Sequence, residues 1–142
     1  MGLPRLVSRR SLPASMFRHR SQPTEDRVRY IDHKGTAVLL VDMSQCSAAE
    51  VEKISKAVPG YVTGEPRGSV LILADLTGAE FDKNAVAEMK KGMVFDRPHV
   101  KRSAWVGADA LPKAFYDSIK AFTQRDFPAF PTREAALDWL VQ

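Results

Sequence analysis

Two aspartates at the ends of apolar runs are the residues best suited to do chemistry. Asp42 closes the run at residues 36–42, and Asp75 closes the run at residues 69–75. If both runs are strands of one sheet, the two carboxylates lie on one rim, where such a pair can bind a metal or transfer protons. Aspartate at a strand end also commonly forms turns and caps. Because no third ligand is spaced nearby, we predict neither a catalytic nor a metal-binding role.

The single cysteine is the other candidate for chemistry. Cys46 comes just before a predicted helix N-terminus, where the helix dipole lowers a thiol pKa and favours a nucleophile. Nothing in the sequence places His33 or His99 beside it, and a lone cysteine is usually a small buried apolar group. We therefore predict no catalytic residue and no cofactor. One cysteine also excludes an internal disulfide, which is typical of a reducing compartment such as the cytoplasm.

A basic cluster in the second half of the chain could contact an acidic partner or a lipid headgroup. Its members are Lys90, Lys91, Arg97, His99, Lys101 and Arg102. Glu88 and Asp96 interleave with them, which favours an ordinary solvated face. The cluster is therefore only a possible binding patch.

The overall charge argues against nucleic-acid binding by the folded part. The net charge of +4 arises in residues 1–24, which contain five arginines and no acid; the rest of the chain carries 16 basic and 17 acidic residues. A leader of this composition is typical of a transit peptide, but its prolines favour a disordered basic tail, and Met16 is an alternative start. We predict a disordered leader over residues 1–26 and one domain over 27–142, without a transmembrane segment.

Hydrophobic periodicity predicts an α/β domain with the order ββαβαβαβα. The predicted strands are residues 27–31, 36–42, 69–75, 100–106 and 127–130. The predicted helices are residues 47–58, 84–95, 111–122 and 133–141, the first stopped by Pro59-Gly60. The first two strands form an antiparallel hairpin, and the intervening helices imply parallel pairing of the others, so the sheet is single, mixed and mostly parallel. Pro128 places the last strand at an edge or makes it irregular.

Three segments carry a resemblance to a known family. They are the strand end Asp75-Leu-Thr-Gly78 with Phe81 and Asp82, the strand Val100-Lys-Arg-Ser-Ala-Trp-Val-Gly107, and the closing Phe130-Pro-Thr-Arg-Glu-Ala-Ala-Leu-Asp-Trp-Leu140. Together they resemble the SpoIIAA-like family of bacterial STAS domains, which includes anti-sigma factor antagonists. The resemblance covers about residues 27–141.

The resemblance implies a non-enzymatic regulatory module that docks a protein partner through the strand-end loop and the following helix. The corresponding residues here are Asp75, Thr77, Gly78, Phe81, Asp82, Lys83 and Asn84. Anti-sigma antagonists are switched by phosphorylation of a serine at the start of that helix, and residues 82–84 offer no hydroxyl. Thr77 is the nearest one, and we expect it to hydrogen-bond within its own turn.

A second function stays open from the same resemblance. The family is sometimes grouped with CRAL-TRIO lipid-binding domains, so the chain could carry or sense a lipid or another small apolar ligand in a cleft between helix and sheet. Five aromatic residues could line such a pocket, namely Phe81, Phe95, Trp105, Phe115 and Phe122. Their spacing predicts a core first. Trp105 alternates with Ala104 and Val106 along its strand, so we expect it to face the opposite side of the sheet from them. An apolar pocket would favour the carrier, and an exposed strand-end loop over a closed core would favour the docking module.

Overall fold

The computed structural model describes residues 24–125 and 127–142. The leader predicted over 1–26 lies outside this range except for residues 24–26, which belong to the first helix. The strands are β1 (Val28–His33), β2 (Thr36–Asp42), β3 (Val70–Asp75), β4 (Val100–Val106) and β5 (Ala129–Phe130). The helices are α2 (Thr24–Arg27), α3 (Ala48–Ala57), α4 (Pro59–Val62), α5 (Lys83–Asp96), α6 (Lys113–Thr123) and α7 (Arg133–Leu140), with 3-10 turns η2 (Arg97–His99) and η3 (Ala108–Ala110).

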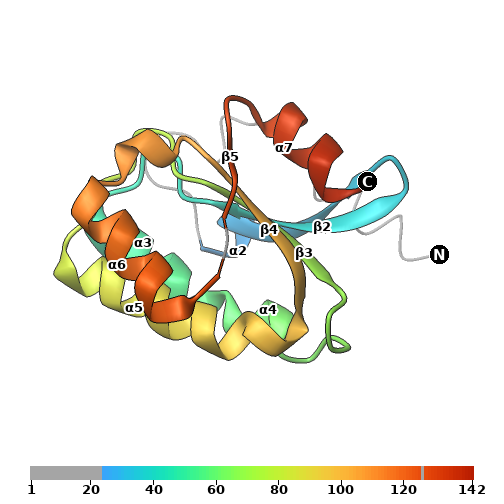
Figure 1. Cartoon of the computed structure of the whole chain (residues 1–142), viewed down its shortest axis with the longest axis horizontal. Coiled ribbons are helices and arrows are strands. Elements are labelled where there is room, and N and C mark those ends of the chain that lie inside the picture. Colours follow the sequence, from blue (N-terminus) through green and yellow to red (C-terminus); the bar gives the residue numbers. More distant parts are fainter. Residues whose placement is uncertain (1–23, 126) are drawn as a thin grey trace.

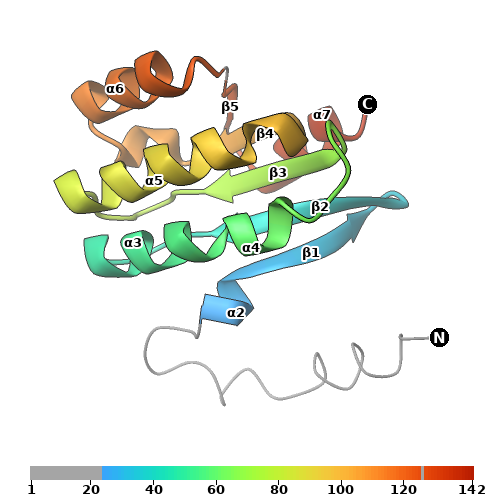
Figure 2. The same ribbon diagram turned by 90° about the horizontal axis from the view of Figure 1, so that it is seen from below.

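The strands form one sheet whose spatial order, β1-β2-β3-β4-β5, follows the chain. β1 is antiparallel to β2, and every other neighbouring pair is parallel. The prediction of a single mixed, mostly parallel sheet is confirmed. Because each crossover moves to the next strand in the same sense, α3, α4 and α5 lie on one face, with α6 packed along α5. Figure 1 shows these helices below the sheet and α7 above it, and Figure 2 shows α7 behind the strands.

The central strand β3 is buried along its whole length, as expected for a continuous apolar run covered on both faces. Alternate side chains enter two cores: Ile72 and Ala74 pack under α3 and α5, whereas Leu73 packs under α7. β4 follows the same alternation. Trp105 lies in the larger core, and its neighbours Ala104 and Val106 face α7, which confirms the expected reversal.

Side-chain caps fix where the helices begin. Ser47 and Glu50 form a capping box at the start of α3. α3 ends at Ala57, so the predicted stop at Pro59-Gly60 is confirmed, but Pro59 also starts the short helix α4, which was not predicted. Proline is tolerated in a first turn, where its missing N–H is not needed.

Two further expectations are corrected by burial and pairing. The last strand is only two residues long, although the Pro128 carbonyl also accepts a hydrogen bond from the Trp105 amide (2.9 Å). Of the aromatic set expected in the core, Phe95 is 61% exposed and Phe122 is 58% exposed. Both lie on the outer sides of α5 and α6, where helical spacing alone did not distinguish an inward from an outward face. None of the helices within the described ranges is long and apolar enough to cross a membrane.

Candidate functional site

The carboxyl ends of β2 and β3 place the two aspartates side by side. Asp42 and Asp75 are register partners on neighbouring parallel strands. Each carboxylate also caps its own turn: Asp42 Oδ1 accepts from the amide (3.0 Å) and hydroxyl (2.6 Å) of Ser44, and Asp75 Oδ1 accepts from the amide (3.0 Å) and hydroxyl (2.7 Å) of Thr77. Thr77 therefore hydrogen-bonds within its own turn, as expected.

Arginines occupy the space where a metal would have to sit. Arg133 Nε donates to Asp75 Oδ2 at 2.6 Å, and its Nη2 lies 3.2 Å from Asp42 Oδ1. Arg27 adds a second cation, 3.5 Å from Asp42 Oδ1. Burial opposes ionisation of Asp75, but hydrogen bonds from Thr77 and Arg133 outweigh it and lower the pKa of this carboxyl. The two aspartates thus anchor the start of α7 to the sheet. Within residues 24–125 and 127–142, no group of three His, Cys, Asp or Glu side chains is arranged to hold a metal ion.

The turn after β3 is held tightly by its neighbours. Gly78 has a φ of +69°, which suits glycine, and a Cβ there would collide with the side chain of Gln45. The backbone N–H of Gln45 donates to the backbone carbonyl of Thr77 at 2.8 Å. On the other side, a Cβ at Gly107 would collide with Thr77. The strand-end turn therefore has little room to change conformation.

Residues 75–84 lead into α5 and are exposed apart from four anchoring positions. Asp75, Leu76 and Ala79 are buried, and Phe81 is partly buried against the larger core. The other residues proposed for partner binding are exposed, namely Thr77, Gly78, Asp82, Lys83 and Asn84. Asp82 is the N-cap of α5, accepting from the Ala85 amide at 2.8 Å.

The basic cluster does not form one surface. Lys90 lies on α5 and donates to Ser118 Oγ of α6 at 2.8 Å. Arg102 lies on the opposite side of the sheet, where it donates to the Trp139 carbonyl of α7 at 3.0 Å. The remaining members are exposed at separate places, with Lys91 on α5, Arg97 in η2 and Lys101 on β4. Residues that are close in the sequence are thus divided between two faces.

The cysteine and the histidines do not come together. Cys46 is 1% exposed, and burial raises the pKa of its thiol to about 11 despite the opposing charge of Arg27. This is the reverse of the activation that a helix N-terminus could have given. His33 instead pairs with Asp138 (2.7 Å), and His99 lies 2.7 Å from the Glu65 carbonyl oxygen.

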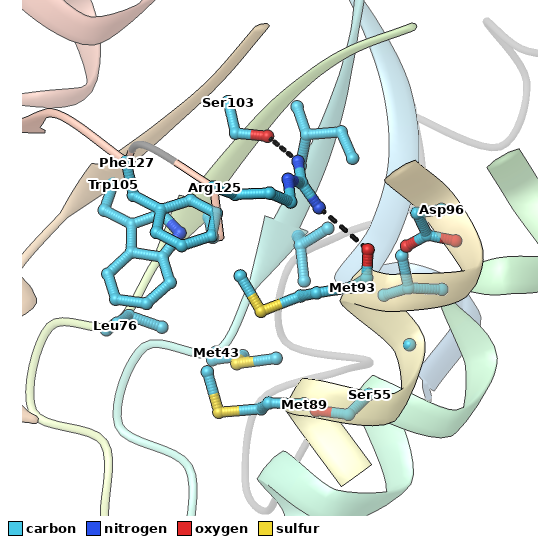
Figure 3. A pocket seen from close by; sticks show the side chains of 15 residues that line it. Met43, Ser55, Leu76, Met89, Met93, Asp96, Ser103, Trp105, Arg125 and Phe127 are labelled. Carbon is cyan, nitrogen blue, oxygen red and sulfur yellow. Dashed lines mark hydrogen bonds between the residues drawn. The ribbon is translucent and has the colours of Figure 1, made fainter. Parts of the chain in front are cut away.

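A cavity of about 60 Å³ lies between the sheet and helices α3 and α5, where the resemblance had implied a ligand cleft; of the five aromatic residues expected to line such a cleft, Trp105 is in its wall. Its walls are mainly apolar and include the side chains of Met43, Met89, Trp105 and Phe127, the last two stacked with ring centroids 4.8 Å apart. The lining residues are buried except for Met93 and Arg125, which are partly exposed and mark its mouth (Figure 3).

The mouth of this cavity is polar. Arg125 donates to the Met93 carbonyl (3.2 Å) and to Ser103 Oγ, and its guanidinium lies 5.2 Å from the centre of the Phe127 ring. Asp96 also lines the cavity and is 3% exposed. Its Oδ1 is buried and receives no hydrogen bond from any residue that the structure describes. Burial raises the pKa of Asp96 to about 6, while the charges of Arg125 and His99 oppose the rise.

The expectation that Asp96 belongs to a solvated face is therefore wrong. Met89, Met93 and Asp96 follow each other at helical spacings of four and three residues, so Asp96 continues the inward stripe of α5. This spacing could have predicted the burial of Asp96 from the sequence. No comparable pattern predicts the position of Arg125, because it reaches the cavity from the segment after α6, far from α5 in the sequence.

Comparison with known proteins supports the fold. No family model matches the chain, and no curated protein matches it. Among solved structures, the chain is similar to an uncharacterised protein from the DUF3478 family with a SpoIIAA-like fold, from Shewanella loihica PV-4. The TM-score is 0.57 at 19% sequence identity, over 80% of this chain and 91% of that one. The chain therefore has the SpoIIAA-like α/β fold that its strand-end and closing motifs implied.

Proposed function

We propose that this protein is a non-enzymatic regulatory module that docks a protein partner through residues 75–84 and the start of α5. The observation that supports docking is that buried, hydrogen-bonded residues hold this segment in place while other residues of the same segment are exposed to a partner. Asp75 is buried and hydrogen-bonded to Thr77 and Arg133, while Lys83 and Asn84 project charge and amide groups into solvent. A preorganised exposed segment loses little conformational entropy when a partner binds it.

Docking in this proposal is independent of phosphorylation at the helix start. Residues 82–84 carry no hydroxyl, and Asp82 places a carboxylate at the N-cap of α5. This fixed negative charge stabilises the positive end of the helix dipole. A partner would therefore meet the same charge pattern at all times, with Asp82 held to the helix and Lys83 free to make contacts.

A second candidate function is the binding of a small apolar ligand or lipid in the helix–sheet cavity. The observation that favours it is the apolar cavity of about 60 Å³ with a partly exposed mouth at Met93 and Arg125. Ligand pockets are commonly apolar cavities with a few polar groups placed at one end. The two candidate sites adjoin at Leu76, which lies within residues 75–84 and also lines the cavity.

Site-directed crosslinking tests the docking surface. Cys46 is the sole cysteine and is buried, so a maleimide–benzophenone reagent would label an introduced surface thiol selectively. We expect labelled Lys83→Cys to crosslink a discrete protein in lysate of the native host, identified by mass spectrometry. Lys101→Cys, exposed on β4, is the matched control.

Three results bear on the docking proposal. Capture of one protein by Lys83→Cys but not by Lys101→Cys, followed by binding of the purified pair, would support it. Capture by the control alone would place the interface elsewhere. A purified partner whose affinity is unchanged by Lys83→Glu would also refute the assignment.

A further inference from the structure

The cavity contains one feature that an ordinary packing defect does not explain. Buried polar atoms in folded proteins are nearly always hydrogen-bonded, because burial without a partner removes the hydrogen bonds to water and replaces them with nothing. Asp96 Oδ1 is buried in a residue that is only 3% exposed, yet no described residue donates to it. Asp96 also lines the cavity, so a donor inside the cavity is well placed to satisfy this atom.

We propose that the cavity binds a small neutral ligand of the phenol or alcohol class, whose apolar body lies among the methionines and whose hydroxyl donates to Asp96 Oδ1. This inference rests on the second candidate function and names its ligand class. The carboxylate accepts hydrogen bonds, and the rest of the cavity wall is mainly apolar. The ligand thus needs one donor on an otherwise apolar body.

The charges at the mouth favour a neutral ligand over an ion. Figure 3 shows Arg125 reaching toward the end of α5 that carries Met93 and Asp96. The positive charge of Arg125 acts on the Asp96 site, and it would repel a cationic head. An anionic head would meet the carboxylate of Asp96, while Arg125 already donates to Met93 and Ser103.

The methionine walls allow the cavity to adapt. A volume of about 60 Å³ is well below the roughly 150 Å³ of an apolar cavity that holds benzene, so a ring enters only if side chains rotate. Methionine has three rotatable side-chain bonds and a polarisable sulfur that contacts aromatic rings favourably. Met43, Met89 and Met93 all line the cavity, and Met93 is partly exposed at its mouth.

The same methionines provide the readout. The chain has five methionines, and three of them line the cavity, so methyl-labelled methionine gives a simple NMR spectrum. Phenol and toluene are matched probes of nearly equal shape, and only phenol can donate a hydrogen bond. We expect both to shift the signals of Met43, Met89 and Met93, with phenol binding about fivefold more tightly, as one net hydrogen bond implies.

Variants locate the binding. Asp96→Leu keeps the approximate shape of the side chain and removes the acceptor, so phenol should lose its advantage over toluene. Asp109→Leu, at an exposed carboxylate, is the matched control and should preserve the advantage. Ala74→Leu adds volume to the cavity wall and should abolish the shifts with both probes. Thermal melts establish whether each variant is folded. If Asp96→Leu is not folded, the relative affinity of the wild-type protein for phenol and toluene tests the proposal.

Each alternative result has a distinct meaning. Equal affinities for phenol and toluene would overturn the hydroxyl proposal but leave apolar-ligand binding standing. Tighter binding of benzoate would overturn it in favour of an anion site at Arg125. Absence of shifts with all three probes, or shifts that persist in Ala74→Leu, would overturn both the ligand class and the second candidate function.

Discussion

The replacement Asp96→Asn should stabilise the protein at neutral pH. Burial raises the pKa of Asp96 from its ordinary value of 3.8 to about 6, and Arg125 and His99 oppose this rise only in part. A carboxyl whose pKa is raised by folding binds its proton more tightly in the folded state. The free energy of unfolding is therefore highest at low pH, falls as the pH rises from about 4 to 6, and remains low above that range.

The size of this effect follows from the pKa. At about 1.4 kcal/mol per pK unit, the wild type loses about 3 kcal/mol of stability across this range. Asparagine carries no ionisable proton, so the variant does not undergo this loss of stability as the pH rises. We expect the unfolding free energies of the two proteins to be similar at pH 4 and to differ by about 3 kcal/mol at pH 8, with the variant more stable.

Urea unfolding followed by circular dichroism from pH 4 to pH 8 measures this difference directly. Titrations common to both proteins cancel in the comparison. Asp109→Asn, at an exposed carboxylate, is the control and should show a small difference that does not vary with pH. A pH-independent difference for Asp96→Asn would refute the reasoning, because it would mean that the wild-type carboxylate is as well solvated in the folded protein as in the unfolded chain.

Three other expectations concern the anchoring residues and the leader. Phe81→Ala should lower the unfolding free energy by about 2 kcal/mol, less than for a fully buried ring because Phe81 is partly exposed; urea denaturation would measure it, and an unchanged midpoint would contradict it. Arg133→Met should cost about 2 kcal/mol because it leaves the buried Asp75 carboxylate without its cation, held only by Thr77. Asp75→Asn should recover part of that loss in a double-mutant cycle, and additive effects would show that the two residues are not coupled. Deleting residues 1–23 should leave Tm nearly unchanged, since their composition cannot bury much apolar surface; a large fall would show that they pack on the domain.

The elements were predictable because local patterns determine them. The continuous apolar run of β3 and the Ser47–Glu50 capping box need no distant information. Trp105 was placed correctly because side chains alternate along a strand. The division of the basic cluster was not predictable from alternation, because the pairing of β4 with β3 shifts register between Val70 and Leu71, beside Lys101, and Arg102 then faces α7.

The candidate site was less predictable because it depends on segments that meet only in the folded chain. The strand-end turn is local, and its hydrogen bonds from Thr77 to Asp75 were expected from residue type. The ion pair between Arg133 and Asp75 joins residues 58 positions apart, and no local sequence pattern predicts it. The cavity mouth likewise joins Arg125 to Met93, which lie 32 positions apart.

The agreement between strand order and chain order has a consequence for synthesis on the ribosome. Each strand from β2 to β5 emerges to find its neighbour already made, so the sheet can grow vectorially from its first edge. Its second face must wait, because α7 is the helix that packs there among the described elements. Until α7 arrives, the apolar side chains of Leu40, Leu71 and Leu73 remain open to chaperones or to other nascent chains. The synthesis of α7 (Arg133–Leu140) therefore decides when this apolar face of the sheet becomes covered.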